Sequence, residues 1–438
     1  MAIIGLSIDK PIMMKEKLLH FIWQNKLFNT KTLITAEHNE LQILDFGRYN
    51  TDGGPDFCNA KIKIDDVVLV GNIELHVYAS DWKLHKHEHD KKYNNVILHV
   101  VYFHDYDIPN INTLVLNGRI SIRLLERYQS LMQSKQEIVC RAHINEVDTF
   151  TIENWKERLL IERFEYKSAY ILQQLKHQQN DWEKTCYHLI GKYFGSHINN
   201  DAFELLCNYL DYKILLKHQD NIFQLEALLY GVAGFLNKDF IEIYPRKLKQ
   251  EYQFLKHKYG LQQMQEHHWQ YLRIRPISFP TIRIAWFASL MQSMPLMQNL
   301  VHTQTSRQVL ENIDVSEYWN SHYMFDKISK IKSKKMGNEF KAILHINVIA
   351  PLLYAYAKYS NDEKYRTAAF EILYTTKPET NAKIKFFDGM NLQQQHAFDT
   401  QALIALYDQY CSNKRCLKCG IGNKILRNNQ TTNAINFA

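Results

Sequence analysis

Glycine and proline are scarce in this chain of 438 residues, with 15 and 9 copies respectively. Both residues interrupt regular helices, so their scarcity favours a helix-rich protein over a loop-rich one. Long apolar runs are missing as well. The most apolar stretch, residues 346–357, is shorter than a membrane-spanning helix and contains Asn347 and Pro351. The sequence therefore predicts no membrane partner.

The cysteines argue against a secreted protein. There are seven of them, an odd number, and they are spread widely along the chain, which is not the pattern of a disulfide framework. The first residues contain an apolar patch, but Asp9, Lys10 and Pro11 interrupt it, so no signal peptide is recognised. These features predict a soluble, cytoplasmic protein.

The charge balance is modestly basic, with 53 Lys and Arg against 46 Asp and Glu and a formal net charge of +7. A surplus of this size is compatible with an anionic partner such as nucleic acid, although many proteins with the same surplus have no such partner. Residues 326–345 form a basic stretch that suits contact with a phosphate backbone, and a solvated helix face is the simpler interpretation.

The spacing of apolar residues changes near residue 147. Before that point, residues 57–64 alternate in polarity, residues 67–78 form the second arm of a hairpin, and residues 96–103 are typical of a buried strand. After it, long amphipathic helical segments dominate. We predict an α+β fold with three parts: a mixed sheet with flanking helices at 1–145, a larger all-α domain at 150–410, and a short cysteine-rich tail at 411–438 with a disordered end.

The hairpin carries the first candidate site. Glu74 and His76 are two residues apart on a strand, so their side chains point to the same face. A turn at residues 65–66 brings Asp56, at the mouth of the first arm, next to Glu74. Two carboxylates this close repel each other unless a cation lies between them, and their oxygens suit Mg²⁺ or Mn²⁺.

A metal held in this way activates a water for attack on a phosphodiester. We therefore predict Asp56 and Glu74 as metal ligands, with His76 as a further ligand or a base near neutral pH. The alternative is an ordinary amphipathic hairpin whose polar residues face outward.

Four other polar residues are candidate accessory groups. His85 and His87 alternate in a polar loop, His99 lies within the apolar strand, and Asn50 precedes the Gly-Gly-Pro turn before Asp56. One interpretation places them around the same metal or phosphate. The other is a solvated loop with one core histidine.

An Asp before a hairpin, followed by Glu74-Leu75-His76 on the next strand, resembles the PD-(D/E)xK nuclease superfamily, which has Lys where this chain has His76. The resemblance implies a restriction-endonuclease-like fold and a metal at Asp56 and Glu74. Because the Lys of that motif orients the attacking water, the replacement leaves open a degenerate, inactive site. Lys61 and Lys63 have the wrong parity to substitute for it unless their strand is bulged.

More broadly, segments such as "GRYNTDGGPDF", "GNIELHVYASDW" and "YCSNKRCLKCGIG" are similar to the DUF2851 family of bacterial proteins, chiefly from Bacteroidetes. The similarity extends over nearly the whole chain. It implies no activity by itself, so the functional expectation depends on the residues.

The second candidate site is a cysteine cluster. Cys411, Cys416 and Cys419 have the close spacing of metal-binding thiols, and Cys140 is our candidate for the fourth ligand, with His143 as a fallback. Four thiolates suit Zn²⁺ or a [4Fe–4S] cluster. Some nucleases of the PD-(D/E)xK superfamily join distant segments with such a cluster, at a different spacing. The alternative is a redox-inert surface tail.

Together these features predict a divalent-metal-dependent nuclease or nuclease-like protein, with DNA rather than RNA as its partner. The alternative function is a non-catalytic nucleic-acid-binding or assembly protein that keeps a degenerate nuclease fold. A metal hydrolase acting on another substrate is a third hypothesis. The sequence contains no indication of the oligomeric state.

Overall fold

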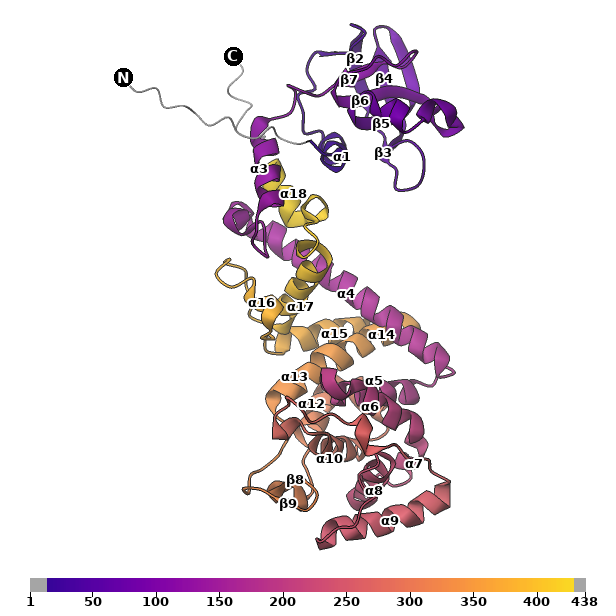
Figure 1. The fold of residues 1–438 in the computed structure, drawn as a ribbon, viewed down its shortest axis with the longest axis vertical. Coiled ribbons are helices and arrows are strands. Elements are labelled where there is room, and N and C mark those ends of the chain that lie inside the picture. The colour runs from indigo at the N-terminus through magenta and orange to yellow at the C-terminus, as the bar shows by residue number, and fades with distance from the viewer. Residues whose placement is uncertain (1–13, 429–438) are drawn as a thin grey trace, which may run out of the picture. The chain divides into compact units, whose positions relative to one another are not determined.

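The computed structural model of the chain, shown in Figure 1, describes residues 14–428. The chain forms two compact units. The first comprises Met1–Trp155, Phe386–Leu392 and Leu406–Ala438, and the second comprises Lys156–Lys385 and Gln393–Ala405. The C-terminal end, for which the sequence predicts disorder, lies outside the described residues from 429 onward.

A mixed sheet of seven strands forms the centre of the first unit within the described residues. The strand order is β1-β2-β4-β5-β6-β7, and β3 pairs with β4 at one side. The pairs β1–β2, β2–β4, β3–β4 and β4–β5 are antiparallel, whereas β5–β6 and β6–β7 are parallel. The strands are β1 Leu33–Ile34, β2 Glu40–Asp45, β3 Arg48–Tyr49, β4 Phe57–Ile64, β5 Val67–Tyr78, β6 Val96–Phe103 and β7 Thr113–Val115.

The β4–β5 hairpin has the register that polarity alternation predicts. Ile64 pairs with Val67 across the turn, and Phe57 pairs with Ile73 at the far end. A bulge interrupts the register between Phe57 and Ala60, where Asn59 has a φ of +59°. The bulge lies next to Asp56, so it influences the direction in which that end of β4 presents its side chains.

Helices and short helical turns complete the first unit. Helix α1 packs against β5, and the connection from β5 to the parallel strand β6 holds α2 and two 3-10 turns. Trp82, Val96 and Ile108 form a small apolar core beneath this connection. These elements are α1 Glu16–Gln24, α2 Asp81–Leu84, η1 His87–His89, η2 Lys91–Tyr93, α3 Ile122–Gln133, η3 Arg141–Glu146, η8 Tyr407–Cys411, η9 Cys416–Lys418 and α18 Gly420–Arg427.

The second unit is largely helical and has one extensive apolar core, with Tyr187, Phe203, Tyr230 and Phe287 among its buried residues. Helices α4 Thr149–His177 and α17 Ala397–Leu406 each have residues in both units. The remaining elements are α5 Trp182–Phe194, α6 Ser196–Tyr209, α7 Tyr212–Leu216, α8 Ile222–Val232, α9 Ile243–Tyr259, η4 Glu266–His268, η5 Pro276–Ser278, α10 Pro280–Met291, α11 Leu296–Leu300, α12 Thr303–Glu311, η6 Glu317–Ser321, β8 His322–Met324, β9 Lys327–Ile328, α13 Asn338–Leu344, η7 His345–Ile349, α14 Ala350–Ser360, α15 Glu363–Thr375 and α16 Ala382–Lys385.

One helical run, Asn338–Ser360, is long and apolar enough to cross a membrane. It is longer than the apolar window visible in the sequence because α13, η7 and α14 continue one another. Most of the apolar part of this run is buried inside the protein, as in the core helix of a globular protein.

The predicted fold class is confirmed at the level of an α+β protein, with a mixed sheet in the N-terminal region followed by a largely helical region. The C-terminal segment from Leu406 is grouped with the first unit, and its described part is mostly helical. Local sequence patterns do not reveal such a return, because the partners are distant in the chain.

Candidate metal centre

The two predicted acids lie at neighbouring positions of the hairpin. The backbone N–H of Asp56 donates to Glu74 Oε2 at 3.0 Å, and the backbone N–H of Leu75 donates to Asp56 Oδ2 at 3.0 Å. Each carboxylate therefore has one oxygen fixed by the partner strand. Glu74 is buried and Asp56 is partly buried, so the pair sits at the edge of the interior.

Four histidines gather beside Glu74. His76 Nδ1 is 2.8 Å from His99 Nε2, and His76 Nε2 is 3.0 Å from His85 Nδ1. His87 Nε2 lies 3.4 Å from Glu74 Oε1, and His76 Nε2 lies 3.7 Å from the same oxygen. His76, His85 and His87 each offer a ligand atom, and these atoms all lie within 4.8 Å of one another.

These histidines come from two parallel strands and from the connection between them. His76 is on β5 and His99 is on β6, where the parallel register pairs Glu74 with His99. His85 and His87 lie in the connection between these strands, at the end of α2 and the start of η1. His85 is exposed whereas the other three are buried, so the cluster is open to solvent on the His85 side.

Helix α1 adds two groups that sequence reasoning missed. His20 Nε2 lies 3.1 Å from Asp56 Oδ2 and 3.7 Å from Glu16 Oε1. Glu16 and His20 are four residues apart and so share one face of the helix, but nothing in the local pattern indicates which strand that face meets.

Aromatic rings hold the histidines in place. Tyr93 stacks on His87 with ring centroids 3.8 Å apart, and Trp82 meets both His76 and His99 edge-on. Trp82 is itself part of the small apolar core under the connection. The loop that carries His85 and His87 is therefore anchored by Trp82 and Tyr93.

The electrostatics of the cluster favour a neutral state when only protein groups are present. Burial raises the pKa of the Glu74 carboxyl, and the nearby charge of Asp56 raises it further. Burial, together with the neighbouring imidazoles, lowers the pKa of His76 to about 2, and burial lowers that of His99 to about 3. Neutral imidazoles are the form in which histidine binds metals.

Several nitrogen atoms here make no hydrogen bond within the described residues. His20 Nε2 and His87 Nε2 face carboxylate oxygens outside hydrogen-bond geometry, and His99 Nδ1 is buried without a partner. Buried polar atoms are normally satisfied, so exceptions of this kind require an explanation. For His87 Nε2, a cation shared with Glu74 Oε1 supplies one.

The donor set fits a transition-metal ion better than Mg²⁺. Bonds of about 2.0–2.1 Å place adjacent ligand atoms about 3.0–3.4 Å apart, and the contacts among His76, His85, His87 and Glu74 span 3.0–3.7 Å. Imidazole nitrogens suit zinc and other transition metals, whereas Mg²⁺ prefers oxygen ligands and water. Glu74 and the histidines therefore fit an ion such as Zn²⁺ or Mn²⁺.

The remaining predicted residues lie around this centre or away from it. Asn50 Nδ2 donates to Pro55 O at 3.0 Å and so braces the turn before Asp56. Lys63 Nζ lies 3.3 Å from Asp66 in the hairpin turn, and Lys61 is exposed, so the contacts of β4 bring neither lysine to Glu74. Cys140, Cys411, Cys416 and Cys419 lie in a separate part of the first unit, among η3, η8, η9 and α18.

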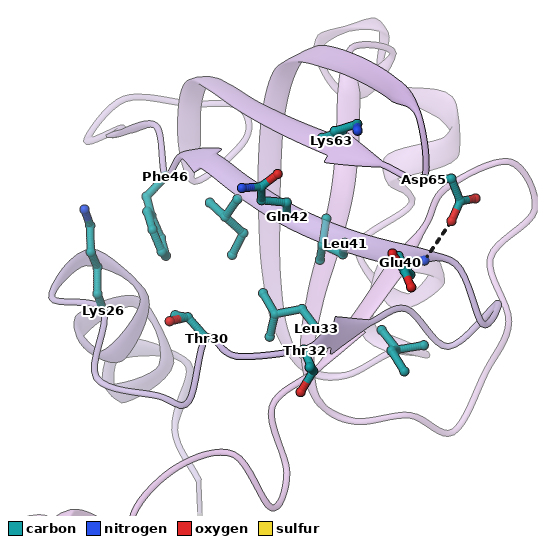
Figure 2. Close-up of a pocket in the computed structure, with 12 residues that line it drawn as sticks. Lys26, Thr30, Thr32, Leu33, Glu40, Leu41, Gln42, Phe46, Lys63 and Asp65 are labelled. Atoms are coloured by element: carbon teal, nitrogen blue, oxygen red, sulfur yellow. Dashed lines mark hydrogen bonds between the residues drawn. The ribbon is translucent and has the colours of Figure 1, made fainter. Parts of the chain in front are cut away.

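An open hollow of about 630 Å³ lies elsewhere on the same unit. Figure 2 shows that Lys26, just after α1, and Phe46 line one end, whereas Glu40 and Asp65 line the other. Lys26 Nζ stands 4.7 Å from the centre of the Phe46 ring, and Asp65 Oδ1 accepts the Glu40 N–H at 2.9 Å. None of its lining residues belongs to the histidine cluster, so the hollow and the candidate centre are different places.

Comparison with protein families identified the model of DUF2851, described as a protein of unknown function, which matches residues 16–382. Comparisons with curated proteins and with solved structures found no match. The chain belongs to the DUF2851 family, whose matched region contains Glu16, His20, the hairpin acids and the four clustered histidines.

Proposed function

We propose that this DUF2851 protein is a divalent-metal-dependent hydrolase of nucleic-acid phosphodiesters, with its metal held by Glu74, His76, His85 and His87. The observation that supports it most is the convergence of three histidine ligand atoms within 4.8 Å beside a buried glutamate. An ordinary polar hairpin has no reason to bury these groups together, because each loses hydration without gaining a full set of partners.

The strand arrangement also supports a restriction-endonuclease-like interpretation of the first unit. Asp56 immediately precedes β4, Glu74 and His76 lie on the antiparallel strand β5, and a helix-containing connection leads to a parallel strand beside it. The PD-(D/E)xK resemblance implies a helix and a strand next to the Glu strand in this way. The motif of that superfamily does not account for the imidazoles around Glu74.

When bound, the metal would lower the pKa of a water molecule that attacks the phosphate. It would also place positive charge beside the scissile phosphate. The N–H of Asp56, which donates to Glu74, and the N–H of Leu75, which donates to Asp56, orient both acids without further reorganisation. His76 is enclosed by His85 and His99, so we assign it to ligation rather than to proton transfer. His20 contacts Asp56, so we assign it as the base that accepts a proton from the attacking water.

A cleavage assay tests the proposal. Labelled single- and double-stranded DNA and RNA are incubated with the full chain and Mn²⁺ or Zn²⁺, and cleavage of DNA is expected. Glu74→Gln should abolish cleavage, whereas Asp66→Asn, at the exposed turn of the same hairpin, should leave it intact. Cleavage that survives Glu74→Gln would place the chemistry elsewhere.

The alternative function predicts a different result from the same assay. A non-catalytic nucleic-acid-binding or assembly protein would bind metal and labelled nucleic acid but leave every substrate uncut. A hydrolase of another substrate class would cleave a small phosphodiester such as bis(p-nitrophenyl) phosphate without binding nucleic acid. Either outcome would contradict the nuclease proposal.

A further inference from the structure

Four cysteines that are far apart in sequence lie on elements that pack together within the first unit. Cys140 immediately precedes η3, Cys411 ends η8, Cys416 begins η9 and Cys419 immediately precedes α18. Helix α18 contacts η3, α3 and η9, and η8 contacts η9. All four cysteines are free thiols, and Cys416 and Cys419 are buried.

The thiols are close enough to affect one another electrostatically. Burial raises the pKa of Cys140 to about 12, and Cys419 and Cys416 add to this effect. Burial also raises the pKa of Cys411, and the other three thiols add to it. Cys419 likewise raises the pKa of Cys416. Each of the six pairs therefore interacts electrostatically, which agrees with the packing of the elements that carry these cysteines.

Backbone donors surround Cys419. The N–H groups of Ile421 and Gly422 hydrogen-bond to its sulfur, although burial still raises the pKa of the thiol. N–H donors that point at a sulfur are the outer-shell contacts that metal-bound thiolates use.

The backbone around the four cysteines is closely packed, and two glycines leave no room for a side chain. A Cβ at Gly420 would lie 2.6 Å from the Trp155 ring, and one at Gly422 would lie 2.4 Å from the Cys416 carbonyl oxygen. Lys414, in the loop between Cys411 and Cys416, donates to Met132 O at 3.0 Å and to Ser134 O at 2.8 Å. The cysteine-bearing loop is thus fastened to the end of α3.

We propose that Cys140, Cys411, Cys416 and Cys419 bind one metal centre through four thiolates, either a zinc ion or a [4Fe–4S] cluster. Tetrathiolate coordination is the shared chemistry of these two centres. His143, the other candidate for the fourth position, already pairs with Glu146 at 2.8 Å. The centre would join the segment after α3 to the C-terminal helix, and it does not depend on the proposed nuclease activity.

Metal analysis of the full chain, purified without oxygen, tests this proposal. The expected result is about one zinc, or about four iron with equal sulfide, in this centre. Iron–sulfur absorption in the visible identifies the cluster.

If zinc is present, replacement by Co²⁺ should give sulfur-to-metal charge-transfer absorption, which ligands at the histidine centre do not produce. Cys419→Ser should lose that absorption, whereas His85→Ala and the matched control Cys186→Ala, a buried thiol of the second unit, should retain it.

Alkylation of the unmutated protein keeps the test decisive if Cys419→Ser fails to fold. With metal bound, the four thiols should resist alkylation, and after metal removal by a chelator or oxidant they should become reactive together. Reaction of the four thiols at the same rate before and after chelation would overturn the proposal. So would a disulfide between any two of them, or absence of both zinc and iron after reconstitution.

Discussion

The backbone N–H of Asp56, just before β4, donates a hydrogen bond at 3.0 Å to the carboxylate of Glu74 on β5. The link is reciprocal, because Asp56 Oδ2 in turn accepts the N–H of Leu75. The hairpin register therefore fixes the acids directly, without relying on flexible side-chain contacts. Glu74 also faces His76 and His87, so it joins the acidic pair to the histidine cluster.

Asp56→Asn should separate the structural role of this residue from its chemical role. The amide keeps an oxygen that accepts the Leu75 N–H, so the free energy of unfolding should fall by no more than about 1 kcal/mol. The negative charge beside His20 and Glu74 is lost, so cleavage should fall at least about 100-fold. Thermal unfolding and cleavage rates of this variant and of Asp66→Asn measure both effects, and unchanged cleavage would contradict the assigned role.

His99 should act as a positioning residue for the metal ligand His76. Its Nε2 contacts His76 Nδ1 at 2.8 Å and so sets the tautomer and direction of that ring. His99→Phe should weaken Zn²⁺ binding about 10- to 100-fold, and His99→Gln, which keeps a hydrogen-bonding group, should restore part of it. Titration calorimetry measures these affinities. Equal affinity for the unmutated protein and His99→Phe would rule the role out.

His20→Gln should slow cleavage without loss of metal. His20 contacts Asp56 rather than the histidines around Glu74, so the ligand set stays intact. Removing a general base typically costs about 10²- to 10⁴-fold in rate. The kcat should therefore drop by this factor while the Zn²⁺ affinity stays within about twofold. His89→Gln, at an exposed position near His87, is the control. A loss of metal binding equal to the loss of rate would show that His20 is a ligand instead.

Glu226 makes the stability of the second unit depend on pH. Its carboxyl accepts hydrogen bonds from Tyr244 and from Ser316 Oγ at 2.8 Å, and burial raises its pKa to about 7. Between pH 4.5 and 7 the unfolded chain ionises this group while the folded chain keeps it protonated, so stability should fall as the pH rises. The fall is on the order of 3 kcal/mol.

Chemical denaturation across that pH range measures this effect. Glu226→Gln should flatten the decline, because a neutral side chain then occupies the site at every pH. Glu371→Gln, on an exposed position of α15, should leave the pH dependence unchanged. A decline of the same size in Glu226→Gln would assign it to another group.

Much of the hairpin could be predicted from the sequence because it depends on local spacing. Alternation over residues 57–64 identifies β4 with its observed bounds, and the two-residue period places Glu74 and His76 on one face. The position of the turn then brings Asp56 next to Glu74. These are consequences of strand periodicity, so they need no knowledge of other parts of the chain.

The contribution of α1 could not be predicted in the same way. Glu16 and His20 lie on a helix whose partner strand is set by tertiary packing, and an amphipathic pattern does not name that partner. Mg²⁺ or Mn²⁺ is the expectation from Asp56 and Glu74, with His85 and His87 as candidate accessory groups. Their alternation in a polar loop does not show whether the loop turns toward Glu74, and the folded connection brings their ligand atoms close to that of His76.

Anomalous diffraction from crystals soaked in Zn²⁺ or Mn²⁺, recorded at the metal's absorption edge, tests the histidine centre most directly. A strong peak is predicted about 2.0–2.2 Å from ligand atoms of Glu74, His76, His85 and His87. The peak should disappear in Glu74→Gln combined with His87→Ala. A metal bound at another position, or no peak beside these residues at saturating metal, would contradict the account.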